Sequence, residues 1–399
     1  FIREGRSDAS VVPEDTSNII YELGLNQKVY VSIIAEAGYA LDGTPYITYG
    51  SSTVDMTKDG NRWHFTMPSA DVVIHAPMRK VFRTQSVLLS GQIGINFFVD
   101  LAGLDRENCR MKFTVGSAEP VWDDFDPDHH STVNPSNFGF TCFINAIQMA
   151  DDILAELYCG DERISYKHYS LQEYVQYFDR TDSTQDSNLA SLRVIRSMID
   201  FGYYAQQYLF LAKPALAESY AQVERHYATQ FDYATIKRMT ESHSLSNSTN
   251  KNLGKSDVDR VTLQLSLDSA TALLINIYMK ESTETVPTIT IGGVTVNVGD
   301  TDVPYSRWKL SLTDRSSGTT RCYQLRIAGI SPHNLDLQFN IKGTAGGRFT
   351  LKASAFSYID SVLSVESMPN LDEAKMMVAA MYQFHEAEVA YRQSAGMGN

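Results

Sequence analysis

The stretch FTCFINAIQMADDILAEL at residues 140–157 returns near the end of the chain as FTLKASAFSYIDSVLSV at residues 349–365. A shift of 209 positions (349 − 140) aligns Phe140 with Phe349 and Asp151 with Asp360. Each copy begins with alternating apolar residues and continues with apolar residues three and four apart, the pattern of a strand that runs into a helix. We therefore interpret each copy as a strand–helix unit.

Two weaker echoes occur in the same order in both halves of the chain. Residues 93–99 (IGINFFV) resemble residues 273–279 (LLINIYM), and MIDF at residues 198–201 resembles MYQF at residues 381–384. The latter pair falls in long helical patterns, at residues 188–211 and 371–391. One short match would arise by chance, but three in a common order favour an internal duplication.

Length and charge limit the classes of protein. A chain of 399 residues is too long for one core and predicts two or three domains. The formal charge of −13 argues against a nucleic acid or an anionic membrane as partner. The sequence contains no run of about twenty apolar residues, the length that a helix needs to span a bilayer. The polar first residues lack the apolar core of a signal peptide, which favours an internal piece of a longer protein.

The cysteines give no framework of their own. The four of them, Cys109, Cys142, Cys159 and Cys322, lack the close spacing of a metal or redox motif. Cys142 alternates with apolar neighbours, which predicts a buried free thiol. A disulfide is compatible with the sequence but is not needed at this chain length.

The segment after the polar start is typical of a small all-β module. Residues 28–34 (KVYVSII) alternate as a strand, GYALDG at residues 38–43 favours turns, and the segment closes with FTMPSADVVIHA at residues 65–76. This order, over residues 18–77, resembles the divergent B-repeat module of internalin-type bacterial surface proteins. The resemblance implies a β-grasp-like spacer on a secreted or wall-attached protein of Gram-positive type.

The rest of the chain carries a second resemblance. GFTCFINAIQMADD at residues 139–152 and MIDFGYYAQQY at residues 198–208 resemble segments of large uncharacterised surface proteins of gut Firmicutes. The resemblance extends over most of residues 86–393. It implies a location at the cell surface and no particular chemistry.

These observations predict a multidomain α+β protein. We expect a polar segment at residues 1–17, the β module at residues 18–82, and two related α+β units at residues 83–250 and 251–399. Each unit would pack helices on a short, mostly antiparallel sheet. We expect a monomer.

The acidic loop at residues 122–130 is the first candidate binding site. Trp122 stands beside a run of aspartates that includes Asp124 and Asp126, and oxygen ligands at alternate positions could hold Ca²⁺. The loop lacks the glycine and glutamate that a calcium loop needs, so a solvated acidic loop is the plainer interpretation, and a ligand-binding loop is the third.

Two aromatic residues of the second half are the other candidates. Tyr305 and Trp308 could form a stacking platform for a sugar or an anchor for a protein partner. The alternative is that Trp308 is a core residue of a strand.

The sequence contains no motif for catalysis. A nucleophile elbow, a zinc-binding His-Glu-x-x-His and a phosphate-binding glycine loop are all absent from it. We therefore expect neither a cofactor, a metal nor catalytic residues. A glycosidase would escape this search, because its two carboxylates need no fixed spacing.

The functional hypothesis is a non-catalytic, extracellular binding protein of adhesin type. A duplicated unit usually repeats a scaffold or a binding surface, and exposed loops carry recognition. A host protein, such as a secreted immunoglobulin, is the first choice of partner, and it rests on the inferred habitat. The alternatives are a carbohydrate-binding module or a structural spacer, and thirdly an unrecognised hydrolase.

Overall fold

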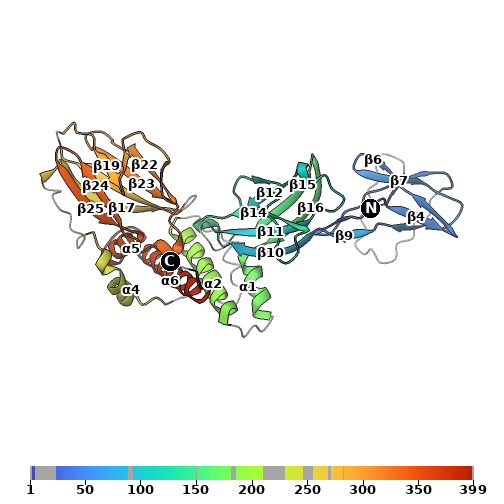
Figure 1. Ribbon diagram of the computed structural model, residues 1–399. Coiled ribbons are helices and arrows are strands. Elements are labelled where there is room, and N and C mark those ends of the chain that lie inside the picture. Colours follow the sequence, from blue (N-terminus) through green and yellow to red (C-terminus); the bar gives the residue numbers. More distant parts are fainter. Residues whose placement is uncertain are drawn as a thin grey trace. The chain divides into compact units, whose positions relative to one another are not determined.

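The computed structural model describes residues 2–4, 24–88, 93–149, 151–180, 186–209, 230–245, 255–267, 271–281 and 283–397. Figure 1 shows its helices and strands in chain order. Most of the polar segment at residues 1–17, the start of the β module at residues 18–23 and most of the polar stretch that joins the two halves lie outside this part.

The fold class differs from the expectation. In the described part of the chain, strands account for 41% and helices for 25%, with seven small antiparallel sheets and five α-helices. The α+β class, with a β-grasp-like module and helices packed on short sheets, is therefore wrong. The protein is mostly β.

The chain divides into two compact units. Unit 1 consists of Phe1–Ser86, Asn96–Cys142 and Ile153–His168, and unit 2 consists of Val87–Ile95, Phe143–Asp152 and Tyr169–Asn399. Unit 1 thus contains the N-terminal β module and most of a first β-sandwich. Unit 2 contains the described helices and a second β-sandwich.

The N-terminal β module forms three small sheets, in the orders β1-β2-β7-β6, β3-β9 and β5-β4-β8. Its core consists of Val29, Val31, Ile47, Met56 and Phe65, against which Trp63 packs in a partly buried position. The strands are β1 (Ile2–Glu4), β2 (Lys28–Val31), β3 (Tyr39–Leu41), β4 (Tyr46–Tyr49), β5 (Ser52–Asp55), β6 (Thr57–Asp59), β7 (Arg62–Thr66), β8 (Val73–His75) and β9 (Met78–Lys80).

The first β-sandwich pairs a three-stranded sheet, β10-β11-β14, with a four-stranded sheet, β13-β12-β15-β16. The inner faces meet where Phe97 of β11 packs against Phe113 of β12, with ring centroids 5.4 Å apart. The strands are β10 (Phe82–Leu88), β11 (Gly94–Asp100), β12 (Cys109–Val115), β13 (Val121–Asp124), β14 (Asn137–Phe143), β15 (Ile153–Cys159) and β16 (Glu162–Tyr169), with a 3₁₀ turn η1 at Arg106–Asn108.

The stretch at residues 140–157 is not a strand–helix unit. It forms the end of β14, a 3₁₀ turn η2 (Ala146–Gln148) and the start of β15. The buried apolar residues of β15, Ile153, Ala155 and Leu157, alternate along a strand. The same apolar residues also fit the spacing of a helix. The segment forms a strand because β15 pairs with β12.

The second β-sandwich pairs the sheet β17-β18-β23-β22-β21 with the sheet β20-β19-β24-β25. The strands are β17 (Val258–Ser266), β18 (Ala272–Met279), β19 (Thr288–Ile291), β20 (Val294–Val296), β21 (Val303–Tyr305), β22 (Trp308–Asp314), β23 (Cys322–Ala328), β24 (Phe339–Thr344) and β25 (Arg348–Ala353). A 3₁₀ turn η5 (Pro332–Asn334) lies between β23 and β24.

The two sandwiches share one strand order. In the first, strands one, two and five form one sheet, and strands four, three, six and seven form the other. The second has the same order once the added hairpin β21–β22 is set aside. This is the two-sheet antiparallel architecture of immunoglobulin-like domains.

Two of the three sequence echoes lie on equivalent elements of this order. Residues 93–99 and 273–279 mark the second strand of each sandwich, and residues 198–201 and 381–384 lie in long helices that follow the last strands. The alignment of Phe140 with Phe349 is wrong. Phe140 lies in β14, the fifth strand of the first sandwich, whereas Phe349 lies in β25, the seventh strand of the second once the hairpin β21–β22 is set aside.

Each sandwich is followed by a short helix and then a long one. The helices α1 (Leu171–Arg180) and α2 (Asp186–Tyr208) follow the first sandwich, and α5 (Ala355–Ser364) and α6 (Leu371–Ser394) follow the second. The predicted long helices are thereby confirmed. Within unit 2, α2 and α6 lie side by side (Figure 1), with Phe201 near Phe384. The remaining described helices are α4 (Tyr233–Thr240) and the 3₁₀ turn η3 (Glu241–His243).

A disulfide joins the two central strands of the first sandwich. Cys109 on β12 and Cys159 on β15 are direct partners across the ladder, with Cα atoms 4.0 Å apart. Cys142 and Cys322 are buried free thiols, as predicted for Cys142. Burial raises the pKa of the Cys142 thiol to about 12, so this thiol is inert in the folded protein.

We expect the thiol content to report this pairing. None of the four cysteines should react with a thiol reagent in the native protein, two should react after unfolding without reductant, and all four after reduction. The paired change of Cys109 and Cys159 to Ser should destabilise unit 1 by about 2–4 kcal/mol, because the unfolded chain gains freedom. Four reactive thiols in the unfolded, unreduced protein would contradict the pairing.

Candidate functional site

Unit 1 contains a cleft of about 910 Å³. The N-terminal β module forms one wall and the β15–β16 hairpin of the first sandwich forms the other. Four aromatic residues contribute to it, Tyr39 and Trp63 from the module and Tyr158 and Tyr166 from the sandwich. Its size is in the range of clefts that bind small ligands.

Backbone contacts hold the two walls of the cleft together. The Gly38 amide donates to the Tyr166 carbonyl at 2.6 Å, and the Ser165 hydroxyl donates to the Tyr39 carbonyl at 2.7 Å. Gly38 has φ of +86°, which a side-chain-bearing residue rarely adopts. The Gly-Tyr turn noted in the sequence therefore has a structural role, which is to join the module to the sandwich.

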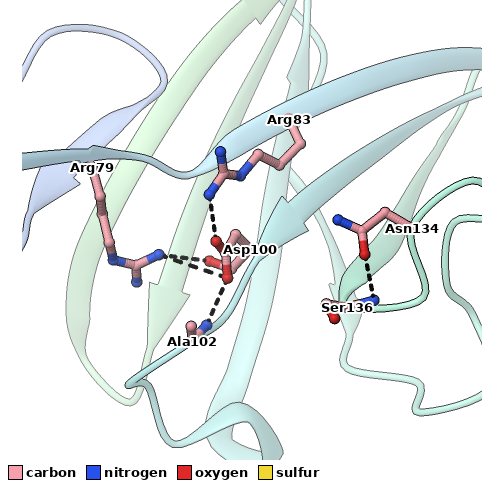
Figure 2. A network of polar contacts seen from close by, with 6 residues as sticks. All are labelled: Arg79, Arg83, Asp100, Ala102, Asn134 and Ser136. Carbon is pink, nitrogen blue, oxygen red and sulfur yellow. Dashed lines mark hydrogen bonds and ion pairs between the residues drawn. The ribbon is translucent and has the colours of Figure 1, made fainter.

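A network around Asp100 braces the same junction (Figure 2). Arg83 on β10 donates to the Asp100 carboxylate at 2.5 Å, and Arg79 on β9 donates to the Asp100 carbonyl at 3.1 Å. The Ala102 amide also donates to this carboxylate, at 2.9 Å. Burial alone would raise the pKa of Asp100, but the hydrogen bonds from Arg83 and Ala102 outweigh it and lower the pKa.

The cations that line the cleft are in ion pairs. Lys58 lies 3.0 Å from Glu162, and Arg163 lies 2.7 Å from Glu156. Glu156 also accepts from Lys112 at 3.1 Å. Burial acts to raise the pKa of Glu156, yet these two cations lower it overall. Glu156 is therefore a fixed anion that orients two basic side chains.

An exposed aromatic surface lies on the outer face of the sheet beside this cleft. We call it the Trp122 face, and it consists of Arg110, Lys112, Trp122, Asp124 and Tyr158. Trp122 is 42% exposed on the edge strand β13. The Arg110 guanidinium lies 4.2 Å from the centre of the Trp122 ring, and Tyr158 packs against its edge. These contacts hold the indole in place.

The aspartates after Trp122 lie at the end of β13 and in the segment that follows it. Asp124 is the cross-strand partner of Arg110, and the Asp126 carboxylate accepts from the Asp128 amide at 2.9 Å. Asp123 accepts from the Thr141 amide, and burial raises its pKa. Among the described residues, no group of three His, Cys, Asp or Glu side chains could hold a metal ion.

The other two predicted binding residues serve the core of unit 2. Tyr305 and Trp308 are cross-strand partners in the β21–β22 hairpin. Trp308 is 8% exposed and packs against Phe339 of the opposite sheet. Tyr305 covers Gly292, where a Cβ atom would meet its ring at 2.3 Å. Trp308 is thus the core residue of the alternative interpretation, and Trp122 belongs to the other unit, unit 1.

The sequence interpretation missed the aromatic residues of the cleft. Tyr158 lies in β15, which was expected to continue a helix and so gave no reason to place it beside Trp122. Trp63 lies in β7, and its neighbours across the cleft come from residues about a hundred positions later. A strand assignment for residues 153–159 would have placed Tyr158 on the face of Arg110.

Unit 2 contains a buried pair of titratable groups. His333 in η5 and Glu388 in α6 are 8% and 1% exposed, and the His333 Nδ1 atom lies 3.8 Å from the Glu388 Oε1 atom. Burial raises the pKa of Glu388 to about 7, against the influence of Arg392. Burial lowers the pKa of His333 to about 4, and the cations Arg392 and Arg307 lower it further. The remaining groups near His333 are His385, which lowers this pKa, and Asp336, which raises it.

No model of a known protein family matches the chain, and no curated protein matches it. No helix among the described residues is long and apolar enough to cross a membrane. The geometry therefore carries the functional argument.

We expect Asp100→Asn to loosen the junction. The variant loses the ion pair with Arg83, at a cost of about 1 kcal/mol for a partly exposed pair. Because the pKa of Asp100 is lowered in the folded state, the advantage of the wild type is present at neutral pH and disappears as pH falls below the ordinary value of 3.8. Urea unfolding and amide exchange at Val81, whose amide binds the Gly38 carbonyl, measure the effect.

The control for this variant is Asp59→Asn in the exposed β6–β7 hairpin. It should leave both the stability and the Val81 exchange rate unchanged. Equal behaviour of the two variants would show that the Asp100 network does not brace the junction.

The buried pair in unit 2 predicts opposite pH profiles for two variants. The contribution of His333 to the free energy of unfolding falls as pH decreases from 6.5 to about 4. The contribution of Glu388 falls as pH increases from 4.5 to about 7. Their effects therefore cancel between these limits in the wild type. In Glu388→Gln, stability should rise with pH across this window, and in His333→Gln it should fall. Urea unfolding at several pH values tests this, and wild-type profiles in both variants would contradict it.

Proposed function

We propose that this chain is a non-catalytic, extracellular binding protein that recognises a protein partner through the Trp122 face. The observation that carries the proposal is the exposed Trp122 ring, held between Arg110 and Tyr158 on a rigid sheet. Tryptophan, tyrosine and arginine dominate the binding energy of protein interfaces. Here the three side chain types lie next to one another and are already ordered.

The form of this surface favours a protein over a small ligand. The Trp122 face is the outer side of an antiparallel sheet, and Trp122 lies on its edge strand β13. An open face with one large aromatic residue and alternating charges from Lys112 and Asp124 matches the anatomy of a protein interface, in which a polar rim surrounds an apolar centre.

The disulfide supports the extracellular location. Disulfides persist in oxidising compartments, and they are rare in the reducing cytosol of most organisms. Cys109 and Cys159 are paired in the centre of the sheet that presents Trp122. The partner is a host protein in this proposal. A secreted immunoglobulin is the concrete candidate, and that choice rests on the resemblance to surface proteins of gut bacteria.

The state of Glu156 supports binding rather than hydrolysis. A glycosidase needs one carboxylic acid whose pKa is raised. The pKa of Glu156 is instead lowered by Lys112 and Arg163, and Glu162, which lines the cleft, is paired with Lys58. These carboxylates are arranged to orient cations.

We expect Trp122→Ala to weaken binding of a secreted immunoglobulin at least about tenfold, the loss typical of an interface hot spot. Surface plasmon resonance measures the affinity. Val133→Ala is the control, because Val133 is 93% exposed and lies outside the Trp122 face. Circular dichroism should show both variants folded.

Two outcomes test the choice of partner and the choice of binding surface separately. If immunoglobulin does not bind, the choice of partner is wrong. If proteins captured from mucosal secretions bind wild type and Trp122→Ala equally, the Trp122 face is not the interface.

A further inference from the structure

We propose that the cleft of unit 1 is a second binding site, whose ligand is a neutral oligosaccharide. This inference does not rest on the proposed function of the Trp122 face, although Tyr158 belongs to both sites. It rests on the aromatic lining, the balance of charges and the bracing of the cleft.

Aromatic rings reach the cleft from both of its walls. Tyr39 is 38% exposed, and Trp63, Tyr158 and Tyr166 are partly buried residues of the lining. A pyranose has faces of C–H groups, which carry partial positive charge and pack on the electron-rich face of such rings. Rings on opposite walls suit a ligand with two faces of this kind.

The charges of the cleft exclude a strongly anionic ligand. Its three cations, Lys58, Arg79 and Arg163, each lie within 4.0 Å of a carboxylate oxygen, from Glu162, Asp100 and Glu156 respectively. Glu162 and Asp161 add negative charge to the lining itself. An anionic ligand would have to displace these carboxylates, whereas a neutral ligand leaves the ion pairs intact.

The paired charges still offer hydrogen bonds. A guanidinium has five N–H donors and a carboxylate has about four acceptor positions, so one ion pair uses only part of this capacity. The exposed Asn61 amide supplies both a donor and an acceptor at the rim. Sugar hydroxyls both donate and accept, and they can therefore bind such groups without a change of charge.

The cleft is preorganised. The hydrogen bonds from Gly38 to Tyr166 and from Ser165 to Tyr39 fix the two walls. Arg79, which lines the cleft, is held by Asp100 (Figure 2). A ligand consequently binds without the cost of ordering the site.

The test begins with the full chain on an array of neutral and sialylated or sulfated oligosaccharides. The best neutral oligosaccharide is then titrated by calorimetry. Tyr39→Ala and Asn61→Ala should each weaken its binding about tenfold or more, equivalent to one lost stacking or hydrogen-bonding contact. Tyr39 binds Ser165 through its backbone carbonyl, so the junction survives its substitution.

Two controls make the result specific. Tyr177→Ala, at an exposed tyrosine of α1 outside the cleft, should bind the oligosaccharide as the wild type does. Val133→Ala, an exposed residue outside both the cleft and the Trp122 face, should also leave this binding unchanged. Because the two sites are measured with different ligands, failure of one is distinguishable from failure of the other. If Tyr39→Ala is unstable, Asn61→Ala gives the same readout from an exposed turn.

Three results would overturn the proposal. The first is the absence of binding to any neutral oligosaccharide. The second is binding to anionic glycans alone. The third is neutral binding that neither Tyr39→Ala nor Asn61→Ala weakens.

Discussion

The pairing of β12 with β15 is the interaction on which the first sandwich depends. Along this ladder, Met111, Phe113, Ala155 and Leu157 face inward and form the core. The intervening residues, including Arg110 and Tyr158, face outward and form the Trp122 face. Because side chains alternate along a strand, a register shift of one residue would exchange these two faces. The strand register that buries the core therefore also places Trp122 on the outer face.

The two long helices could be predicted from the sequence for a physical reason. The patterns at residues 188–211 and 371–391 extend over several turns, and only a helix places all their apolar residues on one side. At residues 153–157 the apolar spacing fits a strand and a helix equally. A short segment of this kind takes its form from the strand beside it, here β12, and that partner is distant in sequence.

The candidate site was only partly visible in the sequence for a similar reason. Trp122 could be singled out because its neighbours in sequence are acidic. The sequence could not show that Trp308 is buried and Trp122 is exposed, because Trp308 is buried by Phe339 of the opposite sheet. The cleft could not be predicted at all. Its walls come from segments about a hundred residues apart, and hydrogen bonds from Gly38 to Tyr166 and from Ser165 to Tyr39 join them.

The disulfide between Cys109 and Cys159 also has a mechanical meaning. A pull on the two ends of the chain cannot draw out the 50 positions of sequence that the bond encloses. At about 3.3 Å per residue, roughly 165 Å of contour is withheld from extension. The strand β13, which carries Trp122, lies within that closed loop. A force applied along the backbone passes through the disulfide and not through the segment that carries Trp122. This surface therefore remains folded while other parts of the chain unfold.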